Sequence, residues 1–143
     1  MSFIGQHFIG HDSTAPVTPD AILGHKVIAI YFSAHWCPPC RGFTPILAEF
    51  YKEVKKSSPE DLEIIFVTSD QSAESMADYF KTMPWKAIPF GDPIIAQLKQ
   101  KFQVSGIPCL VVCKPDGTLI TKDGRGDVTH KGAAACKEWV SKA

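Results

Sequence analysis

The sequence predicts an α/β domain in which a central mixed β-sheet is flanked by helices. Three continuous apolar segments, residues 26–32, 62–68 and 109–113, have the length and composition of buried strands. Helical patterns lie between them, and strands that alternate with helices are typical of a layered α/β domain. With 143 residues, the chain is long enough to bury a core without disulfide staples, so we expect one domain over residues 1–143.

The first half of the chain contains the clearest helix. Residues 1–25 look irregular, with short strand and turn pieces around Pro16 and Pro19, and the strand 26–32 follows. A helix is predicted over 39–56 and ends near Ser57-Ser58-Pro59. Its apolar residues recur at helical spacing: Phe43, Ile46, Leu47, Phe50 and Val54.

The second half continues the alternation. The strand 62–68 is followed by a helix over 72–82 and by a proline-rich segment, 83–93, that is predicted to be mostly loop. Asp92-Pro93 is a typical helix start, with an N-cap and a first helical proline.

The last part of the chain should close the sheet. Lys114-Pro115-Asp116-Gly117 predicts a tight turn that links the strand 109–113 to a strand at 118–121, as an antiparallel edge. A final helix is predicted over 130–141.

Two cysteines stand where the first buried strand passes into the first long helix. The segment is Trp36-Cys37-Pro38-Pro39-Cys40. A thiol at a helix N-terminus faces unpaired backbone N–H groups and the positive end of the helix dipole, which stabilise its thiolate. The thiolate is the reactive form, and the two-residue spacing lets Cys40 close a disulfide with Cys37. The pattern therefore predicts dithiol–disulfide exchange chemistry.

A Cys-x-x-Cys motif is also found as half of a zinc site. A zinc site would need a second pair of ligands, for which Cys109 and Cys113 are the candidates. Both fall inside an apolar strand and no histidine stands at ligand spacing beside them, so we favour redox chemistry and expect no metal and no organic cofactor.

Composition excludes several other classes of function. The formal net charge is zero, which argues against nucleic acid or an anionic membrane as the main partner. No apolar stretch reaches membrane length, and the first ten residues do not resemble a secretory signal. With five cysteines, an odd number, we expect a reducing compartment, the cytoplasm and also the nucleus, in which most cysteines are free thiols.

A proline stands at the entrance of the strand 109–113. Pro108 follows Ser105-Gly106-Ile107 and cannot donate a sheet hydrogen bond, so it belongs at an edge or entry point. If Ile107–Pro108 is cis, the backbone of Ile107 is exposed beside the dithiol, where an extended substrate can pair with it. The alternative is an ordinary trans proline at a strand start.

These residues together resemble the thioredoxin superfamily. The match is closer to the nucleoredoxin and tryparedoxin branch, on the segment from Tyr31 to Pro45, which contains the cysteine motif, and on Met83-Pro84-Trp85. The resemblance covers roughly residues 26–126. It implies a thioredoxin-like fold with a helix–strand insertion between the dithiol helix and the cis-proline strand, and a cis Pro108 that faces the dithiol.

The chain also departs from related patterns. Many thioredoxins have a buried acidic residue six positions before the nucleophile, where this chain has Tyr31. Tryparedoxins carry a tryptophan and acidic residues after the second strand, where this chain has Ser69, Asp70 and Gln71. That segment is more like nucleoredoxin, although nucleoredoxins are usually longer proteins. The branch usually has threonine after the cis proline, and here Cys109 stands there.

Four further side chains have two interpretations each. Trp36 is either an exposed platform for substrate or an aromatic that supports the loop, and we favour the platform. Trp85 is either a core residue or part of the substrate rim. His35 either tunes Cys37 or is a solvated loop residue. Arg125, between two glycines, either attracts the anionic groups of a glutathione-like donor or is a surface arginine in a glycine-rich turn.

The remaining cysteines are interpreted mainly as structural. Cys109 and Cys113 should share one face of their strand, as buried thiols, although Cys109 is also a candidate for a third redox-sensitive thiol. Cys136 should lie on the inner face of the last helix.

The chain is therefore predicted to be a monomeric protein-disulfide reductase. Cys37 attacks a substrate disulfide and Cys40 resolves the mixed disulfide, with Trp36 and Pro39 at the rim and Ile107 and Pro108 holding the substrate backbone. The resemblance implies oxidised proteins such as peroxidases as substrates. It also implies a low-molecular-weight dithiol, glutathione or a flavoprotein reductase as electron donor. A redox-sensing module, in which the same dithiol switches affinity for a signalling partner, is the alternative.

Overall fold

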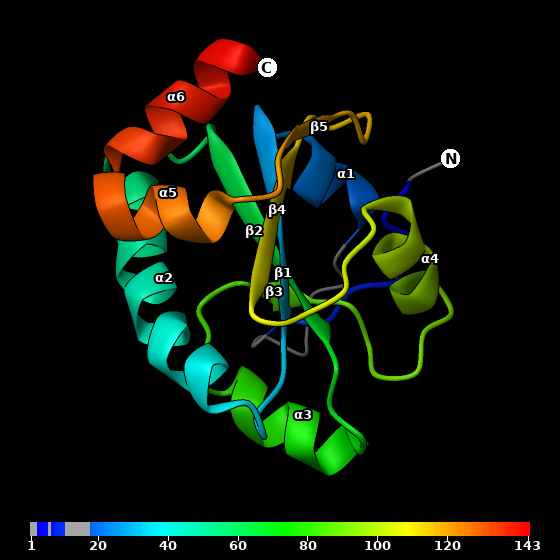
Figure 1. Cartoon of the computed structure of the whole chain (residues 1–143). Coiled ribbons are helices and arrows are strands. Elements are labelled where there is room, and N and C mark those ends of the chain that lie inside the picture. Colours follow the sequence, from blue (N-terminus) through cyan, green and yellow to red (C-terminus); the bar gives the residue numbers. More distant parts are fainter. Residues whose placement is uncertain (1–2, 6, 11–17) are drawn as a thin grey trace.

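A single mixed sheet forms the centre of the molecule (Figure 1). The computed structural model describes residues 3–5, 7–10 and 18–143. Within this part the strand order is β3-β2-β1-β4-β5, with β1, β2 and β3 parallel and β4 and β5 antiparallel to their neighbours. The strands are β1 Val27–Ser33, β2 Leu62–Thr68, β3 Lys86–Ala87, β4 Cys109–Cys113 and β5 Leu119–Thr121. The predicted mixed sheet with an antiparallel edge is confirmed.

Helices cover both faces of the sheet. Side chains of α2, α3, α5 and α6 share one buried cluster, and those of α1 and α4 share the other. Figure 1 shows α2, α5 and α6 together on one side of the strands and α1 and α4 on the other. The helices are α1 Pro19–Leu23, α2 Pro38–Ser57, α3 Ala73–Phe80, α4 Ile94–Lys101, α5 Gly124–Lys131 and α6 Ala134–Lys142.

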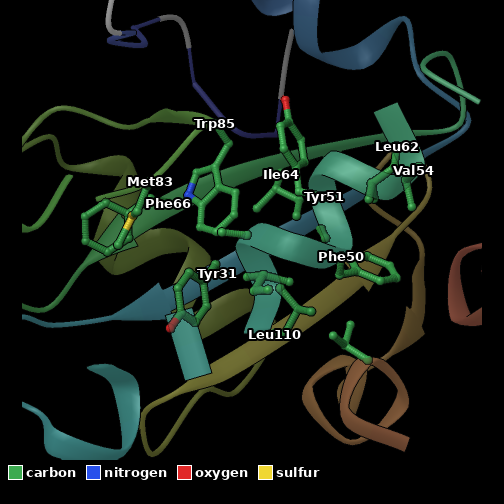
Figure 2. Close-up of a cluster of buried hydrophobic side chains, with 14 of the residues drawn as sticks. Tyr31, Phe50, Tyr51, Val54, Leu62, Ile64, Phe66, Met83, Trp85 and Leu110 are labelled. Atoms are coloured by element: carbon green, nitrogen blue, oxygen red, sulfur yellow. The ribbon is translucent and has the colours of Figure 1, made fainter. Parts of the chain in front are cut away.

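Burial on two sides explains the continuous apolar runs of the central strands. In β1, Val27, Ala29 and Tyr31 face the α2 side, whereas their neighbours in sequence face α1 and α4. A strand with one face in water would instead alternate apolar and polar residues. Figure 2 shows the α2 side, where Trp85 packs edge-on against Tyr31 and Tyr51.

Three elements of the structure were not predicted from the sequence. Helix α1 occupies part of the region predicted to be irregular; Thr18 caps it and Pro19 is its first residue. Strand β3 lies within the predicted loop 83–93. The predicted helix 130–141 is two helices, because α5 already begins at Gly124 and a break at Gly132, with a φ of 57°, separates it from α6. The prediction around Pro16 lies outside the described residues.

Strand pairing brings the cysteine motif and Pro108 together. The parallel strands β1 and β2 end at one edge of the sheet, with Ser33 opposite Thr68. The antiparallel pairing of β1 with β4 places Cys109 opposite Phe32, so Pro108 enters the sheet at that same edge. None of the helices in the described ranges is long and apolar enough to span a lipid bilayer.

Candidate functional site

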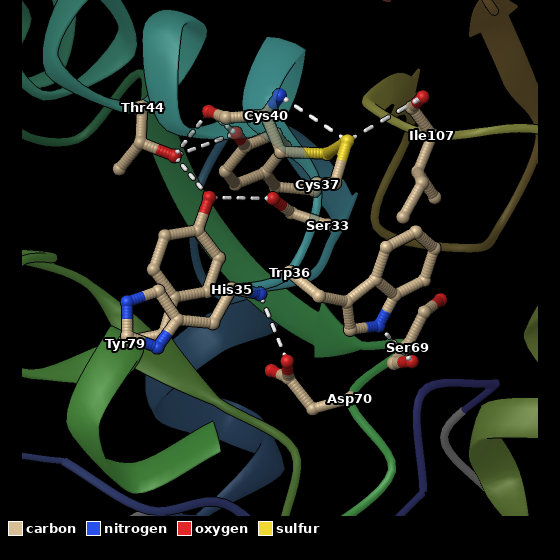
Figure 3. The surroundings of a disulfide bond; sticks show 11 residues. Ser33, His35, Trp36, Cys37, Cys40, Thr44, Ser69, Asp70, Tyr79 and Ile107 are labelled. Carbon is tan, nitrogen blue, oxygen red and sulfur yellow. Dashed lines mark hydrogen bonds between the residues drawn. A yellow bond between two sulfur atoms is a disulfide. The ribbon is translucent and has the colours of Figure 1, made fainter. Parts of the chain in front are cut away.

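The two cysteines of the motif form a disulfide at the start of α2 (Figure 3). Cys37 is the N-cap residue, and Pro38 and Pro39 fill the first two helical positions. Because neither proline has an N–H, the first free backbone donor of the helix is that of Cys40. It donates to Cys37 Sγ over 3.3 Å. In the reduced protein the same N–H would stabilise a thiolate on Cys37.

The two sulfurs differ in access. Cys37 is 5% exposed, whereas Cys40 is fully buried. The predicted order, with Cys37 outside and Cys40 behind it, is confirmed. An external thiol or disulfide can therefore approach Cys37 and not Cys40. This is the asymmetry that thiol–disulfide exchange requires of an intermolecular nucleophile and an intramolecular resolving thiol.

The proline at the strand entrance lies beside the disulfide. The Ile107–Pro108 peptide bond is cis, as predicted. The Ile107 carbonyl oxygen is 4.0 Å from Cys37 Sγ, and the Ile107 side chain packs against Ala34 and both cysteines. Within the described part of the chain, the Ile107 N–H has no hydrogen-bond acceptor. An extended substrate chain can satisfy it.

Trp36 is a large exposed aromatic beside Cys37. It is 56% exposed, and its indole N–H donates to the Ser69 carbonyl over 3.2 Å. The bond ties the ring to the loop after β2, so the ring is held in place while one face stays open (Figure 3). Trp36 is exposed, as its interpretation as a platform requires, and it also contacts the loop, as the alternative interpretation requires. Pro39 is also exposed at the rim.

The buried carboxylate of Asp70 organises the loop that carries the motif. Its Oδ1 accepts the His35 N–H over 2.8 Å and the Ser75 hydroxyl, and its Oδ2 accepts the Thr68 hydroxyl. The His35 ring stacks on Tyr79, with 5.2 Å between centroids. His35 is therefore a half-buried part of the loop, with its ring packed on Tyr79. No local sequence pattern indicates this role of Asp70, because His35 lies 35 residues away in the chain.

A cluster of hydroxyl groups lies directly under Cys40 (Figure 3). Thr44 Oγ1 donates to the Cys40 carbonyl over 2.9 Å, which leaves its oxygen to accept from Tyr31 and Tyr79, at 2.7 and 2.6 Å. Ser33 Oγ lies 2.7 Å from the Tyr79 hydroxyl. Burial raises the pKa of the Tyr31 hydroxyl far above its usual range, so it remains neutral. We call Ser33, Tyr31, Thr44 and Tyr79 the hydroxyl cluster.

Two residues predicted to contact substrate have other surroundings than expected. Trp85 is 1% exposed and packs between two tyrosines, so of its two interpretations the core residue is confirmed and the place at the substrate rim is wrong. Arg125 lies in the first turn of α5 and not in a glycine-rich turn. Its guanidinium carbon is 5.9 Å from the centre of the Phe43 ring, and the side chain is exposed next to α2.

The three other cysteines are free thiols; Cys109 is half-buried, and Cys113 and Cys136 are buried. Cys109 and Cys113 both face the α4 side of the sheet, as predicted. Cys136 is buried among residues of the α2 side. Burial raises the pKa of Cys109, that of Cys113 to about 12 and that of Cys136 to about 11. Within the described ranges, no group of three His, Cys, Asp or Glu side chains is arranged to hold a metal ion.

The fold and the site together define a class of protein. An α/β domain carries a disulfide at a helix N-terminus, with one accessible and one shielded sulfur, beside a cis proline. This is the arrangement of a thiol–disulfide oxidoreductase domain.

Comparison with known proteins narrows the class. A family model described as thioredoxin-like matches residues 24–119. Probable nucleoredoxin 1 of Arabidopsis thaliana is 46% identical over 129 residues, which cover 90% of this chain and 22% of that protein. Tryparedoxin of Trypanosoma brucei brucei is 34% identical and is matched over 97% of this chain and 99% of its own length. The chain belongs to the thioredoxin-like family.

A solved structure supports the same assignment. Thioredoxin from Wuchereria bancrofti superimposes with a TM-score of 0.81 at 41% identity, and the match covers 100% of both chains. The predicted fold and the predicted relationship to nucleoredoxin and tryparedoxin are confirmed. The chain spans about a quarter of the length of the nucleoredoxins that it matches.

Proposed function

We propose that the chain reduces disulfides of protein substrates with Cys37 as nucleophile and Cys40 as resolving cysteine. The observation that carries the proposal is the asymmetry of the pair. Cys37 Sγ is the more accessible sulfur and accepts the Cys40 N–H, and Cys40 is fully buried behind it. A nucleophile needs access and a stabilised thiolate, whereas a resolving cysteine needs only proximity.

Two exchanges complete the reaction. The Cys37 thiolate attacks one sulfur of the substrate disulfide; the mixed disulfide forms, and the other substrate sulfur leaves as a thiolate and takes up a proton. Cys40, once deprotonated, attacks Cys37 Sγ and expels the first substrate sulfur. The substrate has gained two electrons and the Cys37–Cys40 disulfide holds the oxidising equivalent. A donor dithiol returns the pair to the reduced form by the same two steps in reverse.

The surroundings of the disulfide support binding of an extended chain. The unpaired N–H of Ile107 and its carbonyl near Cys37 can pair with a substrate backbone as a short strand would. Trp36 offers an open aromatic face, with Pro39 beside it, on which an apolar substrate side chain can pack.

The substrates and the donor are part of the proposal. Oxidised proteins such as peroxidases are the substrate class that the family relationship favours. A low-molecular-weight dithiol, glutathione or a flavoprotein reductase is the donor, and exposed Arg125 is the residue that would attract its carboxylates. We also propose that the chain acts as a monomer in a reducing compartment, the cytoplasm and also the nucleus. The free thiols of Cys109, Cys113 and Cys136 support the compartment.

Trapping experiments test the assignment of the two cysteines. With Cys40→Ser, Cys37 still attacks, but no neighbouring thiol expels the substrate, so we expect covalent adducts that disappear on strong reduction. Cys37→Ser should give few adducts, because Cys40 is buried. Cys109→Ser is the matched control, and we expect it to reduce insulin at the wild-type rate. If Cys40→Ser alone and combined with Cys109→Ser traps nothing, the two-cysteine mechanism is wrong.

Turnover separates an enzyme from a redox-sensing module. We expect many turnovers per molecule when reduced protein and a dithiol donor are mixed with insulin. A single stoichiometric oxidation, together with tight binding of a partner in one redox state only, would favour the sensor.

A further inference from the structure

A groove of about 440 Å³ opens next to the disulfide. Trp36, Cys37 and Ser69 form one side, and Lys99, Ser105 and Ile107 line the rest. The groove therefore joins the reactive sulfur and the free Ile107 backbone to the end of α4. A substrate segment that pairs with Ile107 lies in this groove, so its side chains meet these walls.

Lys99 alone carries a charge among the described residues that line the groove. It is half-buried, and no carboxylate or other hydrogen-bond acceptor in the described part of the chain pairs with its ammonium group. Its backbone is fixed, because the Lys99 carbonyl accepts the Val104 N–H over 2.9 Å, which closes the loop that follows α4. The backbone that carries this cation is thus held beside the groove.

Asp70, whose neighbour Ser69 lines the groove, forms no ion pair with Lys99. Both Asp70 oxygens accept hydrogen bonds from His35, Ser75 and Thr68. The other lysine of the last turn of α4, Lys101, lies over the rings of Phe3 and Phe102 and lines a different hollow. Lys99 is therefore available to an anion that enters the groove.

We propose that the groove selects protein segments with an acidic side chain close to the reactive disulfide, and that Lys99 is the residue that determines this specificity. The inference rests on the proposed disulfide reduction. A carboxylate held near an unpaired, half-buried ammonium gains attraction without displacing an existing partner. Trp36, Val104 and Ile107 provide apolar wall for the carbon chain of the acidic residue.

Three cyclic peptides, each closed by one disulfide, provide the substrates. The first has Glu next to a cysteine, the second has Lys there, and the third has the composition of the first with its Glu moved to the far side of the ring. Reduction of each by a stoichiometric amount of reduced protein gives a second-order rate constant. We expect the first peptide to react roughly 3- to 5-fold faster than the other two at low salt, and the difference to shrink in about 1 M salt.

Charge reversal supplies the decisive variant. Lys99→Glu should make the Lys peptide the fastest of the three, and Lys99→Ala should remove the preference. Lys137→Glu changes the net charge of the protein by the same amount at an exposed position of α6. This variant should keep the wild-type order of the three peptide rates. Equal rates for the three peptides with the wild-type protein, or an unchanged order in Lys99→Glu, would overturn the specificity while leaving disulfide reduction in place. If folded wild-type protein reduces none of the peptides and does not reduce insulin, the proposed function itself fails, and the inference with it.

Discussion

Helix α2 is attached to the sheet by a buried polar cluster near each of its ends, and the two clusters differ in charge. At the N-terminal end the hydroxyl cluster joins Cys40 and Thr44 to β1 and α3 through neutral groups. At the C-terminal end the contacts are ionic. Glu63 of β2 accepts the Tyr51 hydroxyl over 2.8 Å and lies 3.8 Å from the Lys55 ammonium.

His25 completes the charged cluster. Its Nδ1 is 2.9 Å from the Ile22 carbonyl and donates to it, so Nε2 is left to accept from Lys55, at 3.3 Å. Lys55 also donates to the carbonyls of Leu62 and Pro59. Burial lowers the pKa of Lys55, and the nearby Glu63 carboxylate partly offsets that effect.

The two ends of α2 therefore differ in whether the cluster that anchors them contains a buried charge. A carboxylate next to the disulfide would couple the protonation of Cys40 to its own, whereas a set of hydroxyls hydrogen-bonds without changing charge. The charged cluster lies at the opposite end of a 20-residue helix, where we expect it to affect stability alone. Changes in the charged cluster should therefore alter folding, and changes in the hydroxyl cluster should alter folding and chemistry.

The largest expected effect is at Glu63. Glu63→Gln leaves the half-buried Lys55 without a counter-ion, and we expect a loss of about 2–3 kcal/mol in the free energy of unfolding. Denaturant unfolding of the reduced protein measures this loss. Insulin reduction below the unfolding transition should stay at the wild-type rate. If the folded variant reduces insulin several-fold more slowly, the charged cluster also affects the disulfide site, and the assignment of the two clusters to different tasks is wrong.

A smaller effect is expected at Thr44. Thr44→Val keeps the shape and removes the acceptor of two tyrosine hydroxyls, so we expect a loss of about 1–2 kcal/mol in stability. We also expect slower resolution of the mixed disulfide, measured in a single turnover. Thr129→Val is the matched control, because exposed Thr129 likewise donates to the carbonyl four residues earlier, that of Arg125. Its stability should change by less than about 0.5 kcal/mol. Equal behaviour of the two variants would contradict a role for the cluster.

The smallest effect concerns alkaline pH, where both ends should behave alike. Burial raises the pKa of Tyr31 and of Tyr51 above the usual value of 10.0. The folded state then holds more protons than the unfolded state, so stability falls as pH rises above 10.0. Tyr31→Phe and Tyr51→Phe should each flatten the fall, by at most about 1.4 kcal/mol per pH unit. A pH series of denaturant unfolding tests this; a slope unchanged in both variants would show that the tyrosines ionise equally in both states.

Elements with strong periodicity could be predicted from the sequence. The strands β2 and β4 have the predicted bounds, and the predicted helix 39–56 differs from α2 by one residue at each end. Helix α5 was missed because Gly124 and Gly126 indicate a turn. The structure explains Gly124 by packing, since a Cβ there would lie 2.8 Å from the Leu110 carbonyl oxygen. Asp123, which caps the helix through the Gly126 N–H, was the available signal.

The candidate site could be predicted only where its residues are close in sequence. Cys37, Cys40 and the neighbouring Trp36 belong to one motif. The hydroxyl cluster depends on Tyr79, which is 35 residues from Thr44, and no local pattern links them. The sequence could not decide whether Trp85 is a core residue or a rim residue. Its burial depends on Tyr31 of β1 and Tyr51 of α2, which are far from it in sequence.

The burial of Cys113 and Cys136 restricts the path of electrons through the molecule. Burial raises the pKa of Cys136 to about 11 and that of Cys113 to about 12, so both remain protonated thiols at neutral pH. An attack on the Cys37–Cys40 bond from inside the chain is correspondingly rare. Burial thus protects the disulfide from exchange with Cys113 and Cys136, so in the proposed reaction neither thiol diverts an oxidising equivalent from Cys37.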